Sequence, residues 1–183
     1  MKKIAFISLF FLLGNLYLMA QNDAGNYLTY EGVINTDVSR KASDLFETAK
    51  LWFSKSSPDI KRSADYVNSD EGQIQGQFSL PYFCGIGSMK KIKSNGSITF
   101  NGTVLLKDGK YRYVFDNFIH KGTGISFGKI TTDSFCPYDE IRHGRGFRNN
   151  QWQEIKTLID KKVEDLIQDL KNTMGMAVQK KDW

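Results

Sequence analysis

The chain has few of the residues that usually mark chemistry. It contains two cysteines, two histidines and three prolines in 183 residues. The histidines, His120 and His143, stand far apart and lack the spacing of a metal-ligand motif. No phosphate-binding or dinucleotide fingerprint, internal repeat or low-complexity segment occurs. The sequence therefore predicts neither a resident metal nor a cofactor, and its length is typical of one domain that buries a core without disulfides.

Long apolar runs are also scarce, and the single one lies at the N-terminus. It runs from Ile4 to Leu18, follows two lysines and is interrupted by Gly14 and Asn15. A membrane-spanning helix needs about 20 apolar residues, so this run is short for an anchor. Its length, its basic start and the small residue Ala20 behind it are typical of a secretory signal peptide that is cut after Ala20.

This leader predicts the organisation and the compartment. We expect residues 1–20 to be removed, residues 21–175 to form one domain and residues 176–183 to fray. No cysteine ends the leader, so no lipid anchor is expected, and no later run is apolar enough to span a membrane. The prediction is a periplasmic or secreted protein. Its net charge of +5 is mild, and an exported protein rarely meets nucleic acid, so nucleic acid is not expected as a partner.

Alternation of apolar residues predicts most of the strands. The clearest signal is a hairpin in which residues 97–107 and 110–119 alternate around Asp108-Gly109. That dipeptide favours a type I′ turn, which requires positive φ at both central residues. Residues 120–148 lack periodicity and are expected to be irregular, with a short strand near residues 125–130. The other predicted strands cover residues 27–35, 59–67 and 73–84.

Two helices are expected from apolar positions that recur every three or four residues. The first follows Ser39, a candidate N-cap, and ends before Ser56-Ser57-Pro58. The second runs from Asn150, also a candidate cap, to Thr173. The order is strand, helix, about four strands and helix. It predicts an α+β fold with a single curved antiparallel sheet of about five strands and both helices on one face.

Three segments resemble a known bacterial family. They are Gly32-Val33-Ile34, the helix segment Leu45–Phe53 and the hairpin segment Val104–Tyr113. In this order behind a leader, they are similar to an exported domain of unknown function with a fold like that of TATA-box-binding protein (TBP). The resemblance covers about residues 28–120. It implies the same topology and no activity, substrate or functional residue. It does not imply DNA binding, because a TATA-box reader uses two tandem halves and aromatic wedges.

The strongest local candidate for a binding site lies just before the second helix. Arg142, His143, Arg145 and Arg148 alternate there with glycines, which allow close approach of a ligand. Arginine side chains and the free N–H groups of a helix N-terminus both favour anions. The pattern predicts an anion-binding site, against the alternative of a solvated charged loop.

The two cysteines leave two interpretations open. In an oxidising compartment Cys84 and Cys136 can form one disulfide, but they can also be separate buried thiols. A nucleophilic Cys136 would need His143 within reach as a base, and no catalytic signature surrounds either residue. No catalytic residue is therefore assigned.

The leading hypothesis for function is a non-enzymatic ligand- or partner-binding module of the cell envelope. It would use the open face of the sheet or the 120–148 loop, and a broad apolar patch on that face would favour docking. The alternatives are a cell-envelope enzyme built on Cys136 and His143, and a self-associating envelope component.

Overall fold

The computed structural model describes residues 26–55, 57, 59–84, 94–141 and 143–175. The predicted leader, the C-terminal tail and Arg142 lie outside the described residues, so their predictions stay predictions. No helix in the described part of the chain is both long and apolar enough to cross a membrane.

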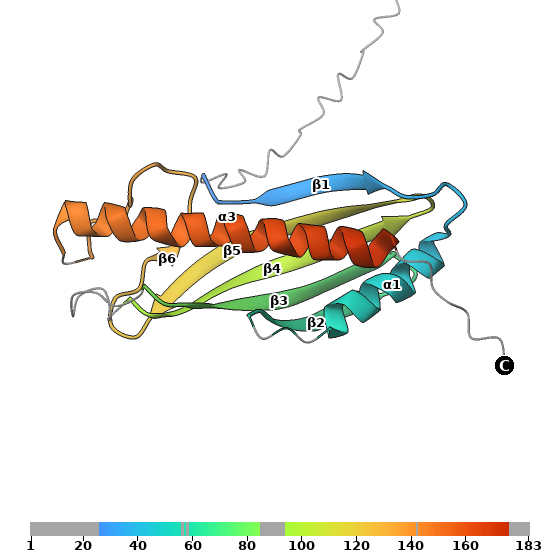
Figure 1. The fold of residues 1–183 in the computed structure, drawn as a ribbon, viewed down its shortest axis with the longest axis horizontal. Helices are drawn as coiled ribbons and strands as arrows, with labels where there is room; N and C mark the ends of the chain where they lie inside the picture. The colour runs from blue at the N-terminus through green and yellow to red at the C-terminus, as the bar shows by residue number, and fades with distance from the viewer. Residues whose placement is uncertain (1–25, 56, 58, 85–93, 142, 176–183) are drawn as a thin grey trace, which may run out of the picture.

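A single antiparallel sheet forms the centre of the fold (Figure 1). Its strand order is β1-β5-β4-β3-β2, and the short β6 pairs with the far end of β5. Because β2 to β5 are consecutive neighbours, they form the predicted meander, and β1 adds to its β5 edge. The strands are β1 (Tyr30–Asn35), β2 (Lys61–Asn68), β3 (Gln73–Tyr82), β4 (Gly96–Lys107), β5 (Lys110–Gly122) and β6 (Gly128–Lys129).

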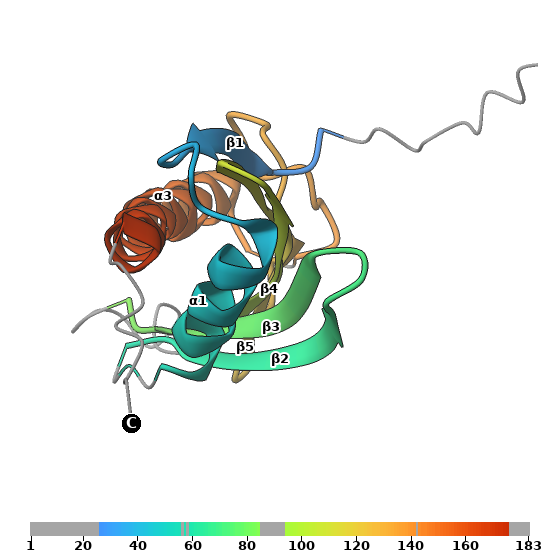
Figure 2. The same cartoon turned by 90° about the vertical axis from the view of Figure 1, so that its right-hand side faces the viewer.

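Both helices, α1 (Ala42–Ser54) and α3 (Arg145–Gly175), lie on one face of this sheet (Figure 2). This arrangement confirms the predicted α+β architecture. The predicted starts of the helices are wrong. α1 begins after Lys41, and its Ala42 N–H donates to the carboxylate of Asp108 at 2.8 Å, so the cap comes from the β4–β5 turn. α3 begins at Arg145, well before Asn150.

The β4–β5 turn also differs from its prediction. Gly109 has φ of 71°, but Asp108 does not have positive φ, so the turn is not type I′. The loop between β1 and α1 is tied to this turn. Gly109 N–H donates to the carbonyl of Arg40 at 2.9 Å, and Thr36 N–H donates to the carbonyl of Gly109 at 2.8 Å. These contacts, together with the capping role of Asp108, set the turn geometry.

A β-bulge in β5 changes which side chains enter the core. The pairing shifts from Thr99–Ile119 to Asn101–Asp116, so two residues of β5, Asn117 and Phe118, oppose one residue of β4. Asn117 has φ of 55°, a conformation that asparagine tolerates better than most residues. As a result, the buried positions change from odd to even numbers along β5. Phe118 and His120 therefore point into the core.

Aromatic side chains fill the space between the sheet and the helices. Trp52 of α1 packs on Phe78 and Phe115, with ring centroids 5.7 and 6.4 Å apart. Phe100 stacks on Phe78 and Phe118. Every buried residue of the described core lies between Leu28 and Met174, so a chain beginning at Gln21 retains the whole described core.

Candidate functional site

The two described arginines of the predicted anion site, Arg145 and Arg148, have separate partners. The side chain of Arg148 is only 12% exposed and is bound to the loop before α3. Its Nη2 donates to Asp139 Oδ1 at 2.8 Å, and its Nη1 donates to the carbonyls of Asp139 and Ile141. Arg145 is exposed and lies 5.9 Å from the ring of Phe135. The geometry therefore favours a structural role for Arg148.

His143 and Cys136 belong to different local clusters. His143 packs edge-on against Phe147, at 5.3 Å between ring centroids. Cys136 is buried, and its Sγ lies 4.0 Å from the carbonyl oxygen of Tyr138. Burial is the main cause that raises the pKa of the Cys136 thiol. A raised pKa disfavours the thiolate that a nucleophile needs. These contacts give no support to the alternative of a Cys136–His143 enzyme.

No disulfide joins Cys84 and Cys136 in this structure. Cys84 lies just beyond β3, where its backbone N–H and Sγ contact Asn95 Oδ1 at 2.9 and 3.0 Å. The backbone N–H of Cys136 donates to Asn149 Oδ1 at 3.2 Å. Each cysteine thus has its own polar partner, as in the interpretation of two separate thiols.

His120 is a core residue of β5, so its predicted place in an irregular loop is wrong. It is fully buried, and its Nδ1 accepts the Phe127 N–H at 3.1 Å. Its Nε2 is 2.9 Å from the carbonyl of Ser94, so the ring proton is assigned to Nε2. Ser94 and Tyr82 both donate to the buried Gln151 Oε1, at 2.9 and 3.2 Å. This polar network joins β5 and the end of β3 to α3.

Burial of His120 predicts a loss of stability in mild acid. Desolvation lowers the pKa of His120 below its ordinary value. In the unfolded chain this histidine becomes protonated near pH 6.5, whereas in the folded chain it stays neutral to a lower pH. The free energy of unfolding therefore falls as the pH drops below about 6.5. The slope is limited to about 1.4 kcal/mol per pH unit for one proton.

Urea unfolding of the chain from Gln21 at pH 7.5 and at pH 5 measures this effect. We expect His120→Phe to flatten the pH dependence, because phenylalanine has no proton to bind. His143→Ala, at a half-buried position outside the core, is the matched control for the loss of a histidine. An equal slope in the His120 variant would show that another group causes the effect.

The open face of the sheet is polar rather than apolar at its centre. Cross-strand neighbours on β3 and β4 form two rows there, Gln77 beside Asn101 and Gln75 beside Thr103. Ser79 and Thr99 continue the pattern. The broad apolar patch that would favour docking does not occupy this part of the face.

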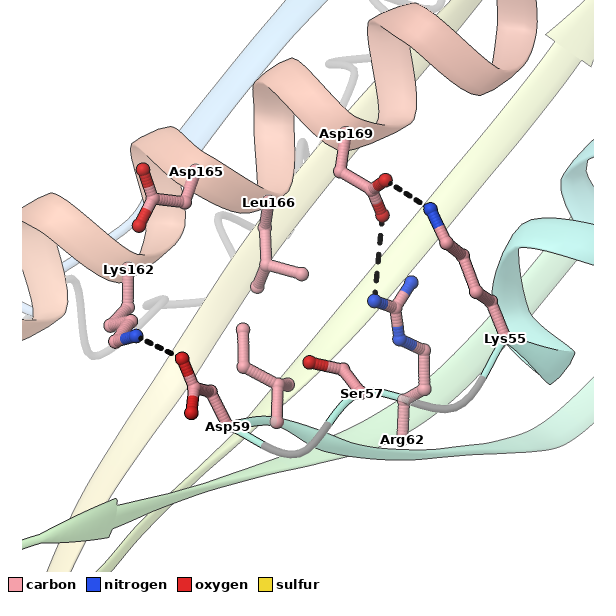
Figure 3. Close-up of a pocket in the computed structure, with 9 residues that line it drawn as sticks. Lys55, Ser57, Asp59, Arg62, Lys162, Asp165, Leu166 and Asp169 are labelled. Atoms are coloured by element: carbon pink, nitrogen blue, oxygen red, sulfur yellow. Dashed lines mark hydrogen bonds and ion pairs between the residues drawn. The ribbon is translucent and has the colours of Figure 1, made fainter.

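A hollow of about 230 Å³ lies between the second half of α3 and the chain that joins α1 to β2 (Figure 3). Ile60 and Leu166 provide its apolar wall. The polar and charged side chains that complete the lining are Lys55, Ser57, Asp59, Arg62, Lys162, Asp165 and Asp169. These residues come from two segments about a hundred positions apart, which the fold brings together.

Ion pairs bridge the two sides of this hollow (Figure 3). Lys162 Nζ contacts Asp59 Oδ2 at 2.9 Å, and Lys55 Nζ contacts Asp169 Oδ1 at 2.6 Å. Burial alone would raise the pKa of Asp169, but Lys55 and the indole N–H of Trp52 hold it below its usual value. Asp169 is therefore a fixed anion that joins α3 to α1.

Arg62 is the buried charge at the inner wall of the hollow. Its side chain is 5% exposed, and its guanidinium lies 4.8 Å from the centre of the Trp52 ring. Nη1 donates to the carbonyl of Trp52 at 2.9 Å, and Nη2 is 3.5 Å from Asp169 Oδ2. The Nε–H is buried without an acceptor among the described residues. Figure 3 shows the Arg62 side chain beside Ser57, with its guanidinium directed toward Asp169.

A larger and shallower groove of about 680 Å³ lies between the end of β3 and the first half of α3. Phe83, Cys84, Glu154 and Leu158 are among its lining residues. Its lining includes Cys84, the last described residue before residues 85–93, which lie outside the described part of the chain, so we assign no site there. Within the described residues, no cluster of three or more histidine, cysteine or acidic side chains has the geometry to hold a metal ion.

The fold, with one antiparallel sheet and two helices on the same face, defines an α+β domain of the TBP-like class. The chain belongs to the family DUF4468, a domain of unknown function with TBP-like fold, whose profile matches residues 30–121. This confirms the resemblance stated from the sequence. The family description carries no activity.

The similar solved structures have low sequence identity to this chain. A DUF4468 family protein from Bacteroides ovatus is 8% identical, with a TM-score of 0.55 over 85% of this chain and 90% of that chain. A TBP-like protein from Parabacteroides distasonis is 11% identical, with a TM-score of 0.47 over 80% of this chain and 94% of that chain. A comparison with curated proteins finds no match.

Sequence reasoning missed Arg62 and the hollow around it. Arg62 lies in a correctly predicted strand, but strand alternation gives no signal that an arginine points inward beneath a helix. Most other residues of β2 are exposed, so the sequence of this strand is typical of a solvated edge strand.

Proposed function

We propose that this chain is a non-enzymatic binding domain of the cell envelope, exported to the periplasm or beyond, and that its ligand is a small amino-acid-like zwitterion. The compartment rests on the leader-like N-terminus. The binding site is the hollow of Figure 3. The observation that carries the proposal is the buried Arg62 Nε–H, which lacks an acceptor. A buried donor without a partner costs about 1–3 kcal/mol, which a ligand oxygen can recover.

The lining of the hollow selects the class of ligand. A ligand carboxylate can accept from Arg62 Nε–H beside the hydroxyl of Ser57. Asp165 is exposed and has no ion-pair partner among the described residues, so it can attract an ammonium group. Ile60 and Leu166 favour an apolar side chain. Because three basic and three acidic side chains balance around the hollow, a zwitterion suits it better than an ion of one sign.

Calorimetric titration of the chain from Gln21 with L-leucine tests this proposal. N-acetyl-leucine lacks the ammonium group, and leucinamide lacks the carboxylate. We expect leucine to bind most tightly, and Arg62→Met to weaken it by about tenfold or more, since a hydrogen bond to a charged group contributes about 1.5–3 kcal/mol. Arg62→Lys keeps the charge but loses the Nε–H, so it should also weaken binding.

Two further variants make the result specific. Asp165→Asn is an exposed change that should preserve the fold and weaken leucine while sparing N-acetyl-leucine. Lys50→Met removes an exposed pair with Glu47 and a contact with the Phe46 ring, both away from the hollow, and should leave leucine binding unchanged. Absence of leucine binding, or equal affinity in the Arg62→Met and original chains with both folded by circular dichroism, refutes the proposal.

A further inference from the structure

A second hollow lies on the open face of the sheet, at the end that carries the β4–β5 hairpin. Val33 of β1, Arg112 of β5 and Leu105 of β4 form one cross-strand row there. The hollow encloses about 230 Å³ above this row, and Lys107 and Lys110 also line it. This end is far along the sheet from β6 and from the start of α3 (Figure 1). It shares no lining residue with the hollow between α3 and the α1–β2 connection that we assign to the small ligand, so the two sites are distinct.

Two valines at this end are unusually exposed for apolar residues. Val33 is 59% exposed and Val38 is 90% exposed. Val38 lies in the loop between β1 and α1, which is fixed to the hairpin by hydrogen bonds on both sides of it, from Thr36 N–H to Gly109 and from Gly109 N–H to Arg40. Because the loop is held in this way, the Val38 side chain projects from an ordered tip.

The charge that surrounds these valines has a positive excess, although the carboxylate of Asp37 lies next to Val38 and interacts with Arg40. Lys41 pairs with Asp108, and Arg112 pairs with Glu31. Lys107 and Lys110 face each other across the end of the hairpin. Neither lysine side chain has a hydrogen-bond or ion-pair partner among the described residues, so two ammonium groups without a counter-ion remain beside Val33.

We propose that this hairpin end docks on the surface of an anionic phospholipid bilayer. Lys107 and Lys110 would contact lipid phosphates, and Val38 with Val33 would enter the interfacial region. The charge complementarity and the projecting apolar tip support this occupant. An ammonium group near an anionic membrane surface contributes about 1 kcal/mol, so the two lysines together are worth about a 30-fold change in partitioning.

Co-sedimentation with vesicles tests the proposal on the chain from Gln21, which lacks the apolar leader. We expect binding to vesicles of phosphatidylcholine with phosphatidylglycerol, weak binding to phosphatidylcholine alone, and loss of binding at high salt. The double variant Lys107→Ala/Lys110→Ala should lower the partition coefficient by about 30-fold. Val38→Asp should lower it as well, because it places a negative charge at the tip.

A matched control separates this site from overall charge. Lys161→Ala/Lys171→Ala removes the same charge from exposed positions on α3 and should retain binding. Equal losses in the two double variants overturn the proposal. So does release by inorganic phosphate under conditions where sodium chloride of the same ionic strength leaves the chain bound, because that result would indicate a free-anion site. Concentration-dependent dimers that the hairpin variant abolishes, without any lipid binding, would assign the surface to a second copy. Leucine binding should be the same in all these variants, so either proposal can fail alone.

Discussion

Trp52→Ala is expected to lower the free energy of unfolding by about 4 kcal/mol, within the range typical of buried tryptophan truncations. Trp52 is fully buried and packs on Phe53, Phe78 and Phe115. Its removal leaves a cavity between α1 and the sheet. It also removes the indole N–H that donates to Asp169 and the ring face against which Arg62 lies. The loss therefore combines a packing defect with two weakened contacts to α3 and β2.

Urea unfolding followed by far-ultraviolet circular dichroism measures this loss independently of tryptophan fluorescence. Leu51→Ala is the matched control, because Leu51 is the preceding residue of α1 and is 63% exposed. Its effect should stay within about 0.5 kcal/mol. Trp52→Phe should fall between the two, because it keeps a ring but loses the N–H donor. If Trp52→Ala were no more destabilising than Leu51→Ala, α1 would not pack on the sheet as described.

The same tryptophan connects stability to the proposed ligand site. Trp52 holds Arg62 through its ring and its carbonyl oxygen, so the guanidinium is positioned by the core rather than by the surface. A fixed guanidinium loses little conformational freedom when a ligand binds, which favours affinity. Trp52→Phe should therefore weaken leucine binding more than its modest effect on stability would indicate.

The predictable part of the fold is the part that depends on local pattern. Alternation around Asp108-Gly109 located the hairpin, and periodic apolar positions located both helices. The turn type and the cap of α1 depended instead on contacts between the loop after β1 and the hairpin, which alternation does not encode. The bulge at Asn117 is also not encoded by simple alternation. It changes the buried positions of β5 from odd-numbered to even-numbered residues within one strand.

The candidate site was less predictable for a related physical reason. The cluster from Arg142 to Arg148 stood out because its charges are adjacent in sequence, yet Arg148 binds the loop beside it. The charges of the hollow, such as Arg62 and Asp169, are separated by about a hundred residues and meet only after α3 packs beside α1 and β2. The sequence pattern of each segment is that of an ordinary solvated face.

Gly76→Ala is expected to be the most damaging small substitution in the sheet, with a loss of about 3 kcal/mol. Gly76 of β3 pairs with Ala64 of β2, next to the bulge where the pairing shifts between Ala64 and Tyr66. A β-carbon at Gly76 would lie 1.9 Å from the carbonyl oxygen of Ser63 and 2.9 Å from the Phe53 ring. The methyl group is therefore blocked by the neighbouring strand and by α1. Neither can withdraw without breaking β2–β3 hydrogen bonds or the packing of Phe53.

Gly146→Ala provides the opposite case in the same chain. Gly146 lies in the first turn of α3, and a β-carbon there would meet no atom within 4 Å. Alanine favours a helix more than glycine does, so this variant should be neutral or gain up to about 1 kcal/mol. The measurement is the midpoint of urea unfolding of each variant, compared with that of the original chain. A midpoint for Gly76→Ala close to that of the original chain would mean that β2 does not pair with β3 in this register, and the inward placement of Arg62 on β2 would lose its support.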